Sequence, residues 1–152
     1  MAKGLPWIEN DGGRKAAGFK GDAGDCLCRA AAIVTGRSYR EVYDLINELA
    51  ERERYARGRL GMMAATGRKS SARTGVYKAT GRDVLESLGL RWTPTMTIGA
   101  GCRVHLAPGE LPAGRLVVQV SKHWTAVIDG VVYDTHDPSR DGSRCVYGYW
   151  SK

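Results

Sequence analysis

Hydrophobic residues recur at helical spacing in the first half of the chain. Ser38 and Glu41 form a capping box, and the apolar positions of the following segment VYDLINELA keep a 3.6-residue period. This pattern predicts a helix that ends near Arg57. Thr80 and Asp83 repeat the cap pattern before the segment DVLESL, which predicts another, shorter helix stopped by a glycine.

The stretch GDAGDCLCRAAAIVTG, residues 21–36, predicts a helix of its own. Asp25 is a good N-cap, an alanine-rich run follows from Cys26 to about Val34, and Gly36 suits the end of a helix. The helix therefore begins with a cysteine, and a second cysteine follows two residues later.

The second half of the chain changes to the strand period. The segments RWTPTMTI, GRLVVQVSK, HWTAVIDG and CVYGYW read as strands, and Asp129-Gly130 is a tight hairpin turn into VVYDTHD. This order predicts an α+β fold in which N-terminal helices pack on a C-terminal antiparallel sheet. The length fits one domain over residues 1–152, with residues 1–24 as a loosely ordered arm.

Positive charge is concentrated in one segment. Residues 52–82 contain nine Lys or Arg against one acidic residue, Glu53, so they carry +8, and the rest of a chain of net charge +7 sums to about −1. Within this basic segment, residues 58–75 predict an irregular loop. The segment is either an electrostatic arm for nucleic acid or an acidic partner, or a solvated loop.

The composition also sets expectations for compartment and metal. No stretch approaches the roughly 18 apolar residues of a membrane span, and the N-terminal sequence lacks the apolar segment of a secretory signal. We therefore expect a cytoplasmic protein without membrane contact, whose thiols stay reduced. Cys102 and His105 have the C-x-x-H spacing of zinc ligands, and the distant Cys145 could join them. Cys26 and Cys28, however, are spaced wrongly on a helix to serve as a second pair of ligands. No metal and no cofactor is expected.

The predicted hairpin places candidate catalytic groups beside one another. With a two-residue turn, Thr125 faces Asp134 and His123 faces His136, and opposed side chains share one face of the sheet. Asp134 is then the diagonal neighbour of His123. Asp137 has the opposite parity and is the reserve candidate, because a slip of one residue would reverse the preference. Such a carboxylate orients the imidazole and stabilises its protonated form, as the third member of a catalytic triad does.

Cys26 supplies the nucleophile that this pair lacks. As the residue after an N-cap, it has its sulfur near the positive end of the helix dipole, which lowers the pKa of a thiol. A neighbouring His123 imidazolium would lower that pKa further. Cys28 lies about 200° round the helix and is assigned to the core, as is Trp124, which points to the opposite face from His123.

These residues resemble the papain-like cysteine peptidases. An acid-preceded cysteine opens a helix in DCLCRAAAIVTGRSYREVYDLI, and a histidine starts a strand in KHWTAVIDGVVYDTHD. Compact bacteriocin-leader peptidases, bacterial cell-wall endopeptidases and uncharacterised phage-encoded members of the superfamily look similar over roughly residues 20–140. The resemblance implies a papain-like fold, with Cys26 as nucleophile, His123 as base and Asp134 as the orienting residue.

The sequence departs from that family at the oxyanion donor. Many papain-like enzymes carry a glutamine a few residues before the cysteine, and here that position is Lys20. The backbone N–H of Cys26 is then one donor, with Lys20 or the backbone of Asp22 as the second. Lys20, Asp22 and Trp124 are the candidate substrate-binding residues, and Gln119 is the only glutamine in the chain.

The predicted function is a cysteine peptidase or isopeptidase of a phage or bacterium, acting on a peptide or protein. Two alternatives stay open. In one, the fold persists without chemistry as a binding protein whose segment 52–82 contacts nucleic acid or an acidic protein. In the other, the same triad serves acyl transfer, as in transglutaminases, with an amine as the acceptor.

Overall fold

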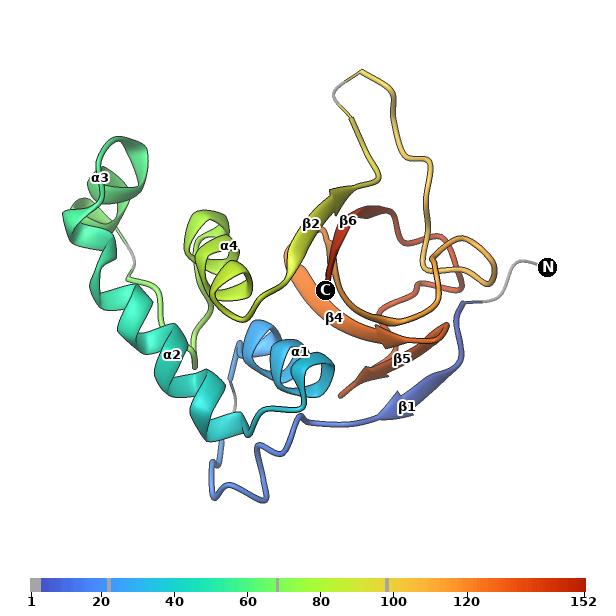
Figure 1. The fold of residues 1–152 in the computed structure, drawn as a ribbon, viewed down its shortest axis with the longest axis horizontal. Helices are drawn as coiled ribbons and strands as arrows, with labels where there is room; N and C mark the ends of the chain where they lie inside the picture. The colour runs from blue at the N-terminus through green and yellow to red at the C-terminus, as the bar shows by residue number, and fades with distance from the viewer. Residues whose placement is uncertain (1–3, 22, 68, 98) are drawn as a thin grey trace.

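The computed structural model describes residues 4–21, 23–67, 69–97 and 99–152, with helices in the first half of the chain and strands mainly in the second (Figure 1). The helices are α1 (Cys26–Thr35), α2 (Tyr39–Glu51), α3 (Arg59–Thr66) and α4 (Lys78–Ser87), with a 3₁₀ turn, η1 (Glu53–Tyr55). The strands are β1 (Trp7–Glu9), β2 (Arg91–Pro94), β3 (Arg115–Val120), β4 (His123–Ile128), β5 (Val131–Asp134) and β6 (Val146–Ser151). This arrangement is compatible with the predicted α+β class.

The strands form one curved, mixed sheet in the order β1-β5-β4-β3-β6-β2 (Figure 1). Neighbouring strands are antiparallel except β1 and β5, which are parallel. The sequence predicts an antiparallel sheet built only from C-terminal strands. That prediction is wrong at the edge formed by β1, which is N-terminal and parallel to β5. Within the predicted loosely ordered arm over residues 1–24, Trp7–Glu9 form β1, so the prediction is wrong for this strand. The backbone N–H of Asn10 and the indole N–H of Trp7 donate to the carbonyl of Asp134, at 2.9 and 3.0 Å.

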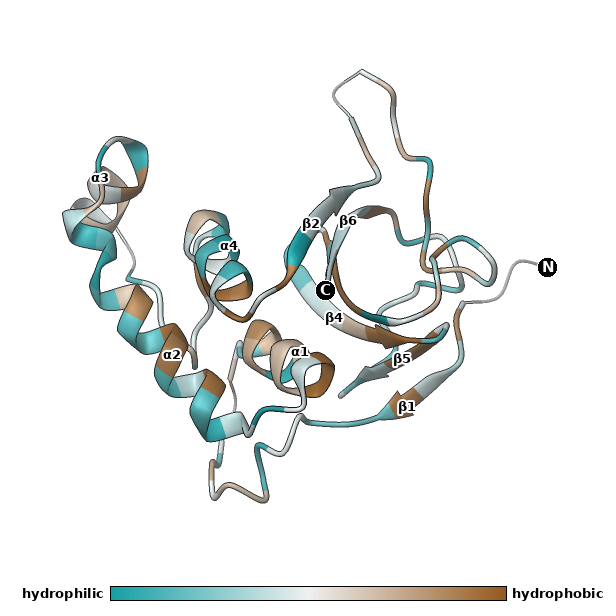
Figure 2. Cartoon of the chain, in the orientation of Figure 1, coloured by the Kyte–Doolittle hydropathy of each residue, from teal (hydrophilic) through white to brown (hydrophobic). Residues whose placement is uncertain are grey.

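Two hydrophobic cores lie on opposite faces of the sheet. Successive residues such as Val117 and Val118 belong to different cores, as the alternation of side chains along a strand requires. One core lies between the sheet and helices α1, α2 and α4, and the hydrophobic side of these helices is visible in Figure 2. The other core is closed by the long connection between β2 and β3, whose Leu106 is completely buried.

Helix α1 begins at Cys26 and ends at Gly36, whose φ of 75° is left-handed, as predicted. Asp25 occupies the N-cap position, but its side chain does not cap the helix. The buried carboxylate instead accepts a 2.5 Å hydrogen bond from the Tyr39 hydroxyl and forms an ion pair with Arg29. A buried charge needs strong partners, and these two outcompete the backbone N–H groups.

The cap of α2 is confirmed, but its end is not where the sequence predicts it. The hydroxyl of Ser38 accepts the backbone N–H of Glu41 at 3.1 Å. The helix ends at Glu51, and η1 takes up the next residues, so the chain leaves the α-helical conformation before Arg57.

The basic segment is more ordered than predicted. Residues 58–75 are not simply an irregular loop, because they contain α3, and α4 begins at Lys78 rather than after a Thr80 cap. The reason is Glu53, a carboxylate only 3% exposed. It accepts hydrogen bonds from the hydroxyl of Thr80 and, at 3.2 Å, from the backbone N–H of Ser70, which ties the start of the segment to its middle and its end.

One cysteine pair is oxidised. Cys102 and Cys145 form a disulfide, whereas Cys26 and Cys28 are free. The expectation of reduced thiols is therefore wrong for this pair, which 43 residues separate in sequence. In the part of the chain that the structure describes, no helix is long and apolar enough to span a bilayer.

Gly81 allows α4 to approach β4, and this contact gives a first prediction. A Cβ at this position would lie 2.9 Å from Cζ2 of Trp124, a rigid ring. Alanine normally favours a helix by about 1 kcal/mol over glycine, but overpacking costs about 1–3 kcal/mol. We expect Gly81→Ala to lower the free energy of unfolding in urea by about 1 kcal/mol. Ser87→Ala, at an exposed position of the same helix, is the control and should not lower it; a more stable Gly81→Ala variant would contradict the close packing.

Candidate active site

The β4–β5 hairpin carries two of the candidate catalytic residues. Its turn residues Asp129 and Gly130 both have positive φ, 48° and 77°, which is the geometry of the predicted two-residue turn. The predicted register is confirmed along the paired part of the hairpin. As a result, His123 and Thr125 on β4 both reach Asp134, the last residue of β5.

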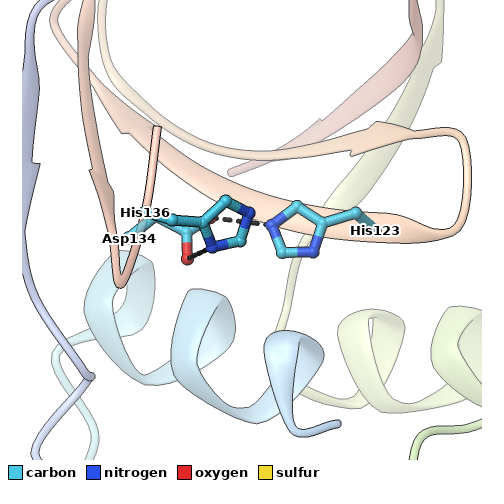
Figure 3. Close-up of side chains that lie close together, drawn as sticks. All are labelled: His123, Asp134 and His136. Carbon is cyan, nitrogen blue, oxygen red and sulfur yellow. Dashed lines mark hydrogen bonds and ion pairs between the residues drawn. The ribbon is translucent and has the colours of Figure 1, made fainter. Parts of the chain in front are cut away.

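Asp134 has partners on both carboxylate oxygens and is only 3% exposed. Oδ2 accepts the Nε2–H of His123 and the hydroxyl of Thr125, each at 2.7 Å. Oδ1 accepts the backbone N–H of Thr135 at 2.7 Å and lies 3.4 Å from Nη2 of Arg29. The carboxylate is therefore fixed in position, and it fixes one nitrogen of His123 in turn (Figure 3).

Cys26 meets the other side of His123. It is the first residue of α1 and is half-buried, and its thiol forms a hydrogen bond with His123. Because Nε2 of His123 is held by Asp134, Nδ1 is the nitrogen left for the sulfur, and Figure 3 shows the second ring nitrogen pointing toward α1. The backbone N–H of Trp124 also donates to the sulfur. Cys28 is fully buried, as predicted for a core residue.

The charges of the three groups support one another. Burial opposes ionisation of Cys26, but the hydrogen bond and charge of His123 outweigh it and lower the pKa of the thiol. Burial likewise opposes the charged form of His123, yet its bonds to Asp134 and Cys26 raise the pKa of the imidazole to about 9. The pKa of Asp134 falls to about 2, because the bonds from His123 and Thr125 overcome its burial. An imidazolium and a carboxylate are thus the favoured charge states near neutral pH, and the charge of His123 shifts the Cys26 thiol toward its thiolate.

By contrast, burial raises the pKa of the Cys28 thiol to about 12, with the negative charge of Asp25 adding to the effect. Two cysteines separated by one residue therefore have opposite chemistry. Only the first is a candidate nucleophile.

A cleft with a volume of about 560 Å³ opens beside Cys26 and His123. Its walls come from the start of α1, the segment 74–76, the start of α4 and the ends of β3 and β4 that meet at their connecting turn. Among the described residues that line it there are two lysines, Lys78 and Lys122, and no Asp or Glu. Gln119 lines the cleft as well.

The predicted substrate-binding residues have different outcomes. Trp124 lines the cleft. Its side chain is also packed in the core beneath the helices and is only 9% exposed, as predicted for a core residue. Lys20 is not among the described residues that line the cleft; its carbonyl accepts hydrogen bonds at 3.1 Å from the side chains of Arg14 and Arg73. Asp22 lies outside the described residues.

The reserve carboxylate does not reach the histidine. Oδ1 of Asp137 accepts the backbone N–H of Ser139 at 2.9 Å, which closes a local turn. Arg29, which sequence reasoning missed, contacts both Asp25 and Asp134. Its only sequence signal is the spacing of four residues after Asp25, which lets an Asp–Arg pair form on a helix.

A second histidine lies next to the site. The ring of His136 is centred 5.1 Å from that of His123, and its Nδ1 lies 3.9 Å from Oδ1 of Asp134 (Figure 3). Ligand atoms of these three residues lie within 4.8 Å of one another, so the group has the spacing of a metal site. In the arrangement seen here, however, His123 and Asp134 are bonded to each other, as a catalytic pair requires.

Comparisons of the chain with protein-family models, with curated proteins and with solved structures found no match. The papain-like family therefore stays a prediction from the motifs quoted above. The function has to be argued from the site itself.

The charge states predict how the cysteines react with iodoacetamide. We expect Cys26 to be alkylated rapidly below pH 7, because its thiolate is stabilised by His123, while Cys28 serves as an internal control and stays unmodified. His123→Ala should slow the reaction of Cys26 at pH 6 by at least about tenfold, since one pKa unit changes the thiolate fraction tenfold. The measurement is mass spectrometry of each cysteine across a pH series. A Cys26 that titrates as an ordinary thiol, with or without His123, would contradict the pair.

Proposed function

We propose that this protein is a cysteine peptidase or isopeptidase that uses Cys26, His123 and Asp134. The observation that carries the proposal is the unbroken chain of hydrogen bonds from the sulfur through the imidazole to a buried carboxylate, beside an open cleft. A nucleophile next to a base that a third group orients is the usual arrangement for covalent catalysis on carbonyl compounds.

The reaction follows from the charge states. The Cys26 thiolate attacks the carbonyl carbon, the S–C bond forms, and the carbonyl electron pair moves onto oxygen. The imidazolium of His123 then gives its proton to the leaving amine as the C–N bond breaks. His123, now neutral, takes a proton from water, which attacks the thioester and releases Cys26. Asp134 keeps Nε2 protonated, so that Nδ1 performs both transfers.

The negative oxygen needs donors, and the cleft offers two. The N–H of Cys26 belongs to the first turn of α1, where N–H groups have no intrahelical acceptor. Gln119 lines the same cleft as Cys26 and His123 and has an amide N–H₂ group. We assign these two groups to the oxyanion in place of Lys20, which does not line the cleft.

The charge of the cleft favours an acidic substrate. Lys78 and Lys122 line it without a neighbouring acidic side chain among the described lining residues. Lys122 has φ of 57°, a conformation that glycine or asparagine adopts more readily. A lysine kept at a strained position next to His123 is consistent with a binding role. The positive charge proposed to select the substrate is thus in the cleft rather than spread over the whole segment 52–82, which contributes core residues through α4.

Substrate hydrolysis gives the direct test of the proposal. Incubation with a library of cellular peptides should yield new termini, as read by mass spectrometry, and Cys26→Ser should abolish them. Asp134→Asn should lower kcat by roughly 10³–10⁴, because the imidazole loses its orientation and charge partner. The profile of kcat/KM against pH should rise at the lowered pKa of Cys26 and fall near pH 9, where His123 loses its proton.

The same experiment separates the alternatives. Products that appear only when an amine is added would identify an acyltransferase on the same residues. No covalent turnover, together with tight binding of RNA, DNA or an acidic protein that weakens steeply as salt rises, would identify a binding protein. Either result would overturn the peptidase proposal.

Lys122 allows a test of substrate charge. Lys122→Asn removes one positive charge while keeping the backbone conformation accessible. We expect the ratio of KM values for neutral and acidic peptides of equal length to fall roughly fivefold, or about 1 kcal/mol for one partly screened charge pair. Raising the salt concentration should shrink the difference. Lys15→Gln, which makes the same change in charge at an exposed position outside the cleft lining, is the matched control; an equal effect of both variants would assign the preference to net charge.

A further inference from the structure

A second cluster of reactive side chains lies away from the cleft, where the connection between β2 and β3 meets the start of β6. Cys102 and Cys145 are joined there, with their Cα atoms 5.9 Å apart. His105 pairs with Cys145 through an isolated β-bridge. Three side chains that can ligate a metal are thus collected from two segments far apart in sequence.

The imidazole of His105 is held in a fixed orientation. Its Nδ1 lies 3.0 Å from Oε1 of Glu110, and the same oxygen accepts the backbone N–H of His105 at 3.1 Å. Because a carboxylate accepts hydrogen bonds, Nδ1 carries the hydrogen and Nε2 keeps its lone pair. Nε2 lies 3.5 Å from the sulfur of Cys102. The lone pair is therefore directed at the sulfur of Cys102.

A disulfide by itself does not require this arrangement. Two sulfurs, an imidazole nitrogen and a carboxylate bonded to the far side of the imidazole are, however, the donor set and the supporting contact of many zinc sites. Exposure also fits, because Cys102 is at the surface and His105 is partly accessible, so a cation and a thiol reductant can both reach the sulfur atoms.

We propose that, once the disulfide is reduced, Cys102, Cys145 and His105 bind one Zn²⁺ ion, with water as the fourth ligand. A dithiol reductant supplies two electrons and two protons: the S–S bond breaks, two thiols form, and the reductant becomes a disulfide. Zinc binding then releases both thiol protons, and the ion is held by two thiolates and Nε2 of His105. Glu110 does not touch the ion; it positions His105.

The two states share one structural consequence. In either state the connection between β2 and β3 is attached to the residue that precedes β6. Val146, the next residue, pairs with Val120, which lines the cleft. Replacement of a covalent bond by a metal therefore keeps this strand in place under reducing conditions.

Metal titration of the reduced protein tests the proposal. The protein carries Cys26→Ser, so that the thiol of the cleft cannot contribute, and a phosphine reductant removes the disulfide before Co²⁺ is added. We expect one Co²⁺ per chain with the intense absorption of thiolate-to-cobalt charge transfer, which Zn²⁺ then displaces. Cys102→Ser and His105→Ala should each lose most of this signal, and Glu110→Gln should weaken binding by about 10–100-fold. The oxidised protein should give no charge-transfer signal.

Several results would overturn the zinc site. One is Co²⁺ bound without charge-transfer absorption, as expected if the ion lies at His123, Asp134 and His136, a group without sulfur. Another is a signal that survives Cys102→Ser, and a third is the absence of a signal in reduced protein whose circular dichroism shows that it is folded. Loss of the fold on reduction alone, not restored by Zn²⁺, would contradict the proposal as well. Cys28→Ser, which removes a buried thiol outside the cluster, is the matched control and should leave the titration unchanged.

Discussion

The buried carboxylate of Asp134 is the group on which the candidate site depends. A carboxylate removed from water has to be paired and hydrogen-bonded, and here the partners come from three elements: β4, the residue after β5, and α1. The same contacts fix the imidazole of His123, raise its pKa and point its free nitrogen at Cys26. The interactions that stabilise this buried carboxylate in the fold are therefore the same ones that set the charge states of the site.

Arg29 connects that carboxylate to the helix that carries the nucleophile. It contacts Asp25, which directly precedes Cys26, and Asp134, which orients the base. The segment before the helix adds to this, because the indole N–H of Trp7 in β1 and the backbone N–H of Asn10, the residue after β1, both donate to the Asp134 carbonyl. The side chain of Arg29 therefore joins the start of α1 to the Asp134 carboxylate, and hydrogen bonds from the segment before α1 hold the backbone carbonyl of the same residue.

The cysteines show how far environment outweighs residue type. Cys26 and Cys28 lie on one helix, but the first has an imidazolium and the backbone N–H of Trp124 beside its sulfur, whereas the second has apolar side chains and a nearby carboxylate. Cys102 and Cys145 are different again, because they meet near the surface beside an oriented imidazole. Each sulfur has the chemistry that its immediate neighbours allow.

The sequence alone determined the parts of this protein that follow from local rules. The start of α1 at Cys26, the Ser38 cap and the β4–β5 register were predictable, because caps, turns and two-residue alternation act over a few positions. The tertiary structure alone decided the pairing of β1, the ion pair of Arg29 with Asp134, the place of Gln119 in the cleft lining and the meeting of Cys102 with Cys145. These contacts form between residues that are far apart in the sequence, and they depend on the order of strands in the sheet and on which group pairs with a buried charge. Neither of these leaves a local pattern in the sequence.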